Sequence, residues 1–514
     1  MTPRSVLSFP EIRSPKKTIV TYPPAMFARL SASALLVAAL VPAAIGAEVE
    51  WNVESGDFMD GANWLTGAVP GPGDDGIISN GGTATLSEGS ATMLQLWVGN
   101  TLHGTREGTL IQTGGSIQLT VGLVVGRQAD AVGTYTMTGG TLTTPDFRIG
   151  GGQANTTSKG TMSVSGEETS VTATGTTVGV GIAGEGSLTI SDSAVFTRTG
   201  GALLIGSDNA VSGAAGGRGT LHVQSEAVVS ISGNLVMGRN PNSVGTVIVD
   251  GGHITSTGQI NLGNVNGGSV GGTGTLTLNS GSVTGNILRI MQGSGTVNLN
   301  GGVLAVNSMF RNGANVSAKV NFNGATVRTS ASGDFFSGFS NNELEIHSGG
   351  LIFDTNGQTV AFAQGFSGVG TFTKTGAGML IMNGISDHTG GTLVDGGLLI
   401  VSPGATLGSG AITVADGGSL DFDYDFTLTT AGLVLETGSE IFLDQNLTFA
   451  GLTIAGDVFE EGVYSYETLE AQYGDIFADG GSGQITVSAV PEPSVVALCG
   501  LATAALLWRS RRRD

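Results

Sequence analysis

The sequence predicts an all-β fold, a right-handed parallel β-helix in which short strands stack coil upon coil. Composition gives two reasons. The 514 residues include 87 glycines but only 13 prolines, with 12% charged and 6% aromatic residues. Hydrophobic residues make up 40%, which argues against disorder, and the absence of a Gly-X-Y period argues against collagen. The third reason is a strand pattern that recurs about every 20–30 residues, which is typical of a solenoid.

The repeat begins with a Gly-Thr or Gly-Ser dipeptide. Eight segments start at Gly108, Gly133, Gly160, Gly186, Gly219, Gly245, Gly274 and Gly295. In seven of them the second and fourth residues after the glycine are apolar, as at Leu188 and Ile190. Alternation of this kind puts one face of a strand inside and the other in water. The first segment is the exception, because Gln112 stands at the fourth position.

A second strand follows in each segment and reads apolar-x-apolar-Gly. It ends at Gly126, Gly150, Gly181, Gly206, Gly238 and Gly263, and at Met291 in the seventh copy. A unit of this size cannot bury its own apolar face, whereas stacked units can. We therefore expect a β-helix over about residues 90–440, with Leu188, Leu221, Val247 and Leu276 in one inward stack. A β-propeller fits less well, because its blades need about 40–50 residues.

The N-terminal stretch has the pattern of a secretory signal. Arg29 precedes the apolar residues 30–41, and small residues follow to Ala47. We expect a signal helix with cleavage after Ala47, and Met26 is a possible true start. The alternative is a buried helix.

The C-terminal stretch combines three features in a fixed order. Pro491, Glu492 and Pro493 come first, and the apolar run 495–508 follows. The basic residues Arg509, Arg511, Arg512 and Arg513 come last. The run is short for a membrane span, but snorkelling arginines extend it, and their charge favours the cytoplasmic side. The body would then lie outside the membrane. The only cysteine, Cys499, lies in this run, so no disulfide can form within the chain.

Charge argues against nucleic acid as a partner. The formal net charge is −20. Without residues 1–47 and 509–514 the chain has 12 basic and 39 acidic residues, a net charge of −27. Such a surface repels nucleic acid and anionic membranes, and it suits a secreted body.

Residues 368–402 read GVGTFTKTGAGMLIMNGISDHTGGTLVDGGLLIVS. They resemble the autotransporter-associated β-strand repeat and depart from it at 386–388, where that family usually has an N-x-Y turn. The matching residues are Gly368, Gly370, Phe372, Lys374, Gly376, Gly378, Leu380, Gly384, Thr389, Gly390, Gly397 and Leu399. The resemblance implies a coil of a β-helical passenger without catalytic residues. Upstream, Trp51 and Trp64 are expected to cap the first coil, and the alternative is that they stack on carbohydrate.

The motif at 491–493, the apolar run and the terminal arginines together resemble the PEP-CTERM sorting signal. The resemblance implies recognition by an exosortase-like membrane protease and delivery to the cell surface or the extracellular polysaccharide. The protein would be held in the membrane only transiently, by its C-terminal helix. The alternative is a permanent single-span anchor.

The sequence suggests no catalytic, cofactor or metal site. The histidines are scattered, at His103, His222, His253, His347 and His388. No H-E-x-x-H, G-x-S-x-G or P-loop pattern occurs, and the loop aspartates are expected to be solvated rather than metal-bound. We expect a non-enzymatic, structural or adhesive component of the cell envelope or the extracellular polysaccharide matrix of a Gram-negative-type bacterium. The alternative is a polysaccharide lyase or hydrolase built on a β-helix.

The expected organisation has six parts. They are the signal (1–47), an N-terminal cap with the first strands (48–100), the glycine-rich repeats (101–330), the autotransporter-type repeat region (331–445), a terminal β region (446–489) and the sorting signal (490–514).

Overall fold

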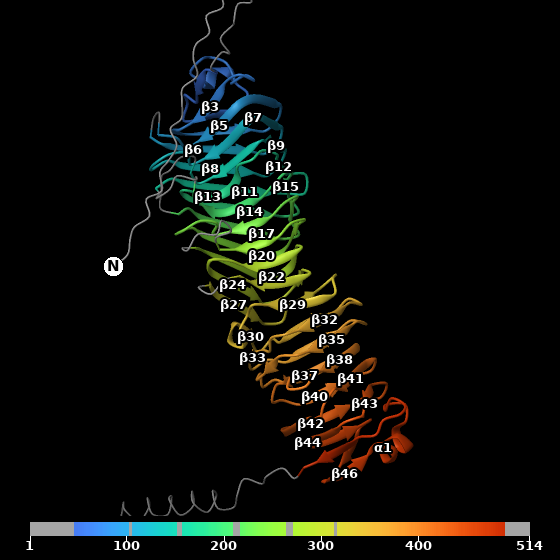
Figure 1. Cartoon of the computed structure of the whole chain (residues 1–514). Helices are drawn as coiled ribbons and strands as arrows, with labels where there is room; N and C mark the ends of the chain where they lie inside the picture. The colour runs from blue at the N-terminus through green and yellow to red at the C-terminus, as the bar shows by residue number, and fades with distance from the viewer. Residues whose placement is uncertain are drawn as a thin grey trace, which may run out of the picture. The chain divides into compact units, whose positions relative to one another are not determined.

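The computed structural model describes residues 46–101, 105–151, 157–208, 216–263, 271–312 and 316–488. All of them belong to one compact unit, Ile45–Asp514. In this unit the chain forms a parallel β-solenoid of about 15 turns (Figure 1). The predicted parallel β-helix is therefore confirmed for the described residues. The predicted signal helix and the apolar run 495–508 lie outside them.

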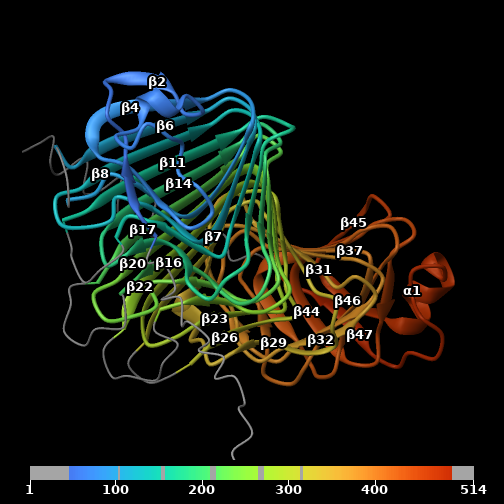
Figure 2. The same ribbon diagram turned by 90° about the horizontal axis from the view of Figure 1, so that it is seen from above.

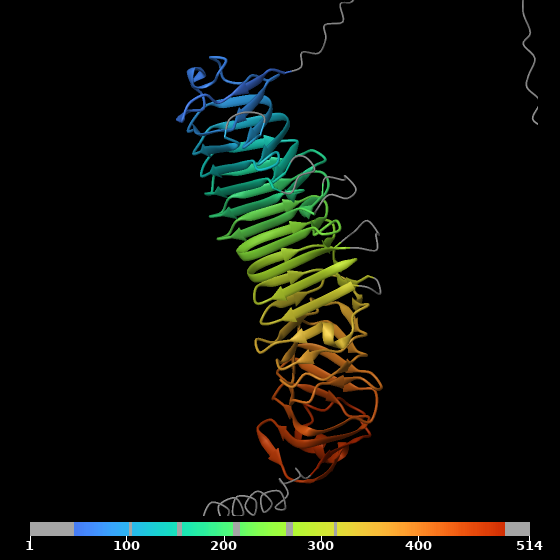
Figure 3. The ribbon, with the colours of Figure 1, turned by 90° about the vertical axis from the view of Figure 1, so that its left-hand side faces the viewer.

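Each turn contributes up to three strand segments, and each segment pairs in parallel with its counterpart one turn later. The pairing defines three stacks of strands, and successive coils lie one upon another from the N-terminal to the C-terminal end (Figure 3). Seen from above, the three stacks enclose the interior (Figure 2). The long strands β5, β7, β20, β22, β42 and β44 bend and belong to two stacks each.

The first stack contains β2 (Ser55–Asp57), β4 (Asn80–Leu86), β6 (Glu107–Gln112), β8 (Val132–Met137), β11 (Lys159–Ser165), β14 (Glu185–Ser191), β17 (Arg218–Gln224), the first parts of β20 (Val244–Ser256) and β22 (Gly272–Thr284), β24 (Gly293–Leu299), β27 (Val316–Phe322), β30 (Leu344–Ile346) and β33 (Ser367–Gly368). A separate pair, β36 (Ile385–Ser386) and β39 (Thr406–Leu407), follows it along the chain.

The second stack contains the first parts of β5 (Ser90–Val98) and β7 (Ser116–Val125), β9 (Thr141–Thr144), β12 (Ser170–Ala173), β15 (Val195–Arg198), β18 (Val228–Ile231), the second parts of β20 and β22, β25 (Val303–Ala305), β28 (Thr326–Arg328), β31 (Leu351–Asp354), β34 (Phe372–Thr375), β37 (Thr392–Asp395), β40 (Ile412–Val414) and the second parts of β42 (Thr427–Leu435) and β44 (Asn446–Ile454).

The third stack contains β1 (Glu48–Glu50), β3 (Asp75–Ile78), the second parts of β5 and β7, β10 (Asp146–Ile149), β13 (Val178–Ile182), β16 (Leu203–Ser207), β19 (Leu235–Met237), β21 (Ile260–Leu262), β23 (Ile287–Ile290), β26 (Ser308–Arg311), β29 (Gly333–Ser337), β32 (Thr359–Phe362), β35 (Met379–Met382), β38 (Gly397–Val401), β41 (Gly418–Phe422) and β43 (Glu440–Phe442).

The interior is built from the apolar positions of the alternating pattern. Leu188 pairs with Leu221, Leu221 with Val247, and Val247 with Leu276. All four side chains are fully buried, which confirms the predicted inward stack. Gln112, the exception in the pattern, also points inward and is fully buried. Its amide contacts the hydroxyl of Tyr135, so the polar group has a partner inside the core.

The glycines that end the second strand of each repeat form a tight corner between the third and first stacks. Gly181 has φ = +69°, and a Cβ there would lie 2.0 Å from the carbonyl oxygen of Arg218. On the facing strand, a Cβ on Gly186 would lie 2.1 Å from the carbonyl oxygen of Ile149. Backbones therefore approach each other directly at this corner, and only glycine fits.

Farther along the chain, phenylalanine fills the interior. Phe353 and Phe362 have ring centroids 4.7 Å apart, and Phe336 and Phe362 are 4.9 Å apart. Phe322, Phe335, Phe339, Phe366 and Phe372 complete this cluster, and all eight are buried. Edge-to-face contacts prevail, which is the arrangement that aromatic quadrupoles favour.

The two ends of the solenoid differ from its middle. At the N-terminal end Trp51 and Trp64 are buried with ring centroids 5.1 Å apart, and Trp64 Nε1 donates to the carbonyl of Phe58 at 2.8 Å. The rings pack as a cap and leave no open face for a sugar. At the C-terminal end β45 (Asp457–Phe459) and β46 (Gly462–Ser465) pair antiparallel with β44 and β47 (Gln484–Val487), beside the helix α1 (Tyr466–Tyr473). The solenoid thus extends beyond the predicted residues 90–440 on both sides.

Candidate functional site

The outward side of the first stack is a ladder of hydroxyl groups. One residue per coil faces out at equivalent positions over nine coils, and eight of the nine are threonine. They are Thr83, Thr109, Thr134, Thr161, Ser187, Thr220, Thr246, Thr275 and Thr296. β-branched residues suit an extended strand, and these side chains are partly or fully exposed. The row itself carries hydroxyl groups, and the same strands also present charged side chains outward, such as the pair Lys159–Glu185.

A polar network interrupts this surface at the corner between the first and second stacks. His222 Nε2 lies 2.6 Å from a carboxylate oxygen of Asp250 on the next coil. The other carboxylate oxygen of Asp250 accepts from Asn279 at 2.6 Å, and Asn300 donates to Asn279 at 2.9 Å. The amide of Asn279, followed by His222, lowers the pKa of the Asp250 carboxyl. Both carboxylate oxygens of Asp250 are therefore already hydrogen-bonded within this network.

A second pair lies near this network. His253 Nε2 lies 3.2 Å from a carboxylate oxygen of Glu226, and His253 Nδ1 lies 2.9 Å from Ser282 Oγ. The predicted scatter of the histidines thus needs qualification, because stacking brings His222 and His253 into two acid–histidine pairs. His347 lies near Asn321 and Glu345, while His388 is buried and contacts the Gly391 carbonyl at 3.0 Å. His103 lies outside the described residues.

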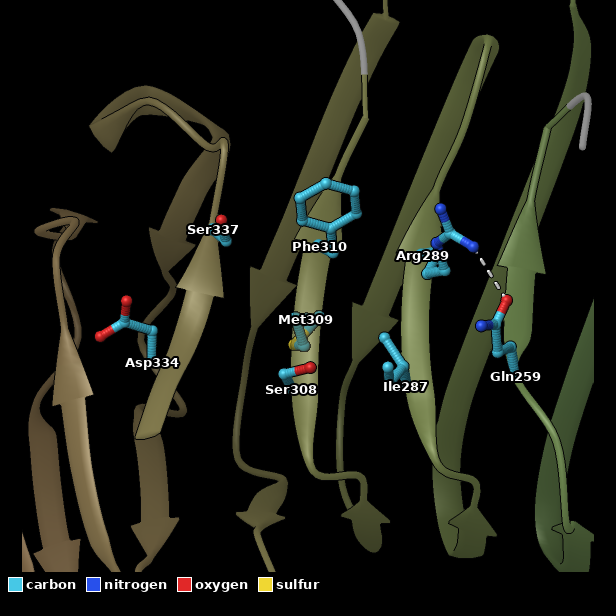
Figure 4. Close-up of a pocket in the computed structure, with 8 residues that line it drawn as sticks. All are labelled: Gln259, Ile287, Arg289, Ser308, Met309, Phe310, Asp334 and Ser337. Carbon is cyan, nitrogen blue, oxygen red and sulfur yellow. Dashed lines mark hydrogen bonds between the residues drawn. The ribbon is translucent and has the colours of Figure 1, made fainter. Parts of the chain in front are cut away.

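A groove crosses the outward side of the third stack (Figure 4). Four neighbouring coils line it, with a volume of about 280 Å³. Its lining residues are Gln259, Ile287, Arg289, Ser308, Met309, Phe310, Asp334 and Ser337. Pairing places Arg289 beside Phe310, and Phe310 beside Ser337. The Arg289 guanidinium carbon lies 5.7 Å from the Phe310 ring centroid, and Arg289 Nη1 donates to Gln259 Oε1 at 3.0 Å.

Sequence reasoning missed this groove. Arg289 belongs to the segment LRIM, which the repeat pattern already identified as a strand. Phe310 follows 21 residues later, in the coil that begins at Gly295, and Asp334 follows 24 residues after Phe310, in a coil that no longer begins with Gly-Thr. The corresponding strand of the next coil reads SMFR. Aligning it with the strand at 287–290 would have placed Phe310 beside Arg289.

The predicted sorting residues Pro491, Glu492, Pro493, Arg509, Arg511, Arg512 and Arg513 lie outside the described residues. No helix in the described part of the chain is long and apolar enough to cross a membrane. Nor does that part contain a group of three or more His, Cys, Asp or Glu residues placed to hold a metal ion.

Ala47, the predicted cleavage residue, lies directly before β1. Its carbonyl accepts from the Asp75 N–H at 2.9 Å, and its own N–H donates to the Asp74 carboxylate at 3.2 Å. The first strand thus begins at Glu48, the residue that would follow the cut. Cleavage itself stays a prediction.

Comparison with known families gives one match. Residues 372–401 match the passenger-associated transport repeat. This finding supports the predicted resemblance to autotransporter-type repeats over that segment. A repeat of this kind within a β-solenoid fits an extracellular or cell-surface β-helical protein. No curated protein and no solved structure matches the chain.

The structure explains what the matched segment encodes. It spans β34 to β38 and covers one coil and part of the next, since Phe372 pairs with Thr392 and Met379 with Leu398. Lys374 is fully buried, and its Nζ donates to the carbonyls of Gly376 at 2.8 Å and Gly396 at 2.7 Å. The lysine therefore joins the turns of two successive coils. Its position in the motif follows from the architecture of the coil.

Proposed function

We propose that this protein is a non-enzymatic, secreted or cell-surface solenoid, a structural or adhesive component of the envelope or of an extracellular polysaccharide matrix. The observation that carries the proposal is the passenger-type repeat within a solenoid whose outward face is a hydroxyl ladder. Nine coils present a hydroxyl at the same position of the first stack. A repeated surface of this kind suits many weak contacts along its length.

Delivery is part of the proposal. The signal at residues 1–47 would direct export, and an exosortase-like membrane protease would recognise the Pro-Glu-Pro motif and remove the tail. Cutting there removes the terminal arginines and Cys499 together. The mature protein would then be acidic and without a thiol.

The test of delivery compares the wild type with the double variant Pro491→Ala/Pro493→Ala in the native host. Cell fractions are separated, and the intact mass of the mature chain is measured in each. We expect wild-type protein in the surface or extracellular fraction, cut near the motif, and the variant retained in the membrane. Equal release of both, or a wild type found only as the full-length chain, contradicts exosortase-type sorting and leaves a permanent anchor.

One observation favours the second candidate, a polysaccharide-active enzyme. His222 and Asp250 are partly exposed, with side chains 30% and 38% accessible, and an acid–histidine pair can serve as a general base. Against this, both oxygens of Asp250 are occupied by His222 and Asn279. The test is incubation with plant and bacterial polysaccharides. Products that disappear in His222→Gln but persist in His347→Gln would establish the enzyme.

A further inference from the structure

The groove on the third stack combines an aromatic ring with planar polar groups. Phe310 is half-buried, on the outward side of β26, and Arg289 and Gln259 lie on one side of it (Figure 4). Asp334 and Ser337 lie on the other side, on β29. The exposed part of this ring is apolar surface that a ligand can cover with a gain in free energy.

The charged groups of the groove lack ionic partners, unlike those close by. Arg311 pairs with Glu343 at 3.0 Å, Lys319 with Glu345 at 2.5 Å, and Arg328 with Asp354 at 2.7 Å. Within the described residues Arg289 has no carboxylate partner, and Asp334 has neither an ion pair nor a side-chain hydrogen bond. The groove thus offers a guanidinium, that of Arg289, and a carboxylate, that of Asp334, neither of which is part of an ion pair in the described part of the chain.

This set of groups matches the chemistry of a sugar. The faces of a pyranose ring carry C–H groups that pack on an aromatic ring, and vicinal hydroxyls match the paired N–H groups of arginine and the paired oxygens of aspartate. The coils repeat at about 4.8 Å, close to the rise of one sugar unit in an extended chain. A groove that crosses successive coils can therefore follow a polysaccharide.

Charge selects the class of polysaccharide. Arg289 and Asp334 balance each other within the groove, and the whole protein has a net charge of −20. A strongly acidic protein repels polyanions at long range. A neutral chain meets no such barrier.

From these observations we infer that the groove is a binding site for neutral polysaccharide, with Phe310 as its stacking platform and Arg289 and Asp334 as hydroxyl-binding groups. The inference deepens the proposed function, because it names the ligand class of a matrix or surface protein. It does not depend on how the chain is delivered.

The experiment measures binding of the purified body to neutral hexasaccharides of β-1,4-glucose, β-1,3-glucose and β-1,4-mannose by isothermal titration calorimetry. Oligogalacturonate of the same length is the acidic probe. Phe310→Ala and Asp334→Asn are the test variants, and Ile400→Ala is the control, because Ile400 also faces outward on the third stack but lies away from the groove. Since Asp334 is exposed and unpartnered, its variant keeps the test valid if Phe310→Ala disturbs the fold.

We expect at least one neutral hexasaccharide to bind, with a loss of about ten-fold or more in Phe310→Ala, a smaller loss in Asp334→Asn and no change in Ile400→Ala. Three results would overturn the inference: no binding of any neutral probe, equal binding by wild type and both test variants, or tighter binding of oligogalacturonate. Hydrolysis of a bound probe would contradict the non-enzymatic function while leaving the binding site intact. The failure of the binding inference can thus be distinguished from the failure of the proposed non-enzymatic function.

Discussion

The glycine-cornered coils and the phenylalanine-packed coils build the same solenoid in different ways. Between Gly99 and Gly263 the backbones meet at the corner, and aliphatic side chains such as Leu188 and Val247 fill the interior. Between Phe322 and Phe372 the interior is aromatic, with eight buried rings in contact. The glycine-cornered coils are visible in the sequence as a repeat, because their corner accepts only glycine. The phenylalanine-packed coils leave a weaker pattern, because an aromatic interior can be filled in many ways.

The largest effect is expected from placing a charge in the aliphatic interior. Val247→Asp buries an unpaired carboxylate between Leu221 and Leu276, and we expect a loss of about 3–5 kcal/mol in the free energy of unfolding. Limited proteolysis should then cut within β20. Thr246→Asp, one residue away and facing outward, is the control. An unchanged digestion pattern in Val247→Asp would show that the position is not interior.

Truncating the centre of the aromatic interior comes next. Phe362 contacts five other rings, and Phe362→Ala leaves a cavity that costs about 3–5 kcal/mol. Thermal unfolding of Phe362→Ala measures this loss of stability. Phe442→Ala is the control, because Phe442 faces outward on β43. A similar loss in both variants would mean that the aromatic cluster adds no stability of its own.

The corner can be tested at two glycines with similar positive φ, Gly181 at +69° and Gly357 at +78°. Gly181→Ala places a Cβ 2.0 Å from a carbonyl oxygen, whereas Gly357, with φ = +78°, has no atom within 4 Å of a Cβ. We expect Gly357→Ala to cost about 1–2 kcal/mol, the cost of the left-handed conformation, and Gly181→Ala to cost more. Hydrogen exchange reports the difference, measured at β13 and β17 for Gly181→Ala and at β31 and β32 for Gly357→Ala. Equal losses would show that the corner tolerates a side chain.

The smallest effect is a pH dependence in the passenger-type coil. Burial lowers the pKa of Lys374 from 10.5 to about 8, and Asp354 opposes the shift. Between these values the unfolded chain holds the proton more often than the folded one, so stability rises with pH across that window. The unfolding temperature should increase slightly from pH 8 to pH 10 in the wild type and less in Lys374→Met. Lys319→Met, at the surface, should keep the wild-type slope.

The two regions also show what sequence can predict. Alternation and glycine spacing were enough to place Leu188, Leu221, Val247 and Leu276 in one buried stack, because period and burial are local properties. The pairs His222–Asp250 and Arg289–Phe310 join residues 28 and 21 positions apart. Which side chains stack there depends on the length of each coil, and coil length varies with loops that carry no pattern. The repeat pattern alone therefore did not reveal the groove, and only an alignment of the strand at 287–290 with that at 308–311 would have brought Arg289 beside Phe310.

The parallel ladders have a consequence for how the chain acquires its structure. Each one joins residues only about 20–30 positions apart, so closing a coil costs modest entropy, and that cost does not grow with the number of coils. A completed coil exposes an unpaired strand edge, which is a template for the next segment. Such a chain can fold in the order in which it emerges from a pore, from the tryptophan-capped end onward. Each coil that adds to the stack on the far side of a membrane then resists backward movement, so folding itself favours one direction of travel.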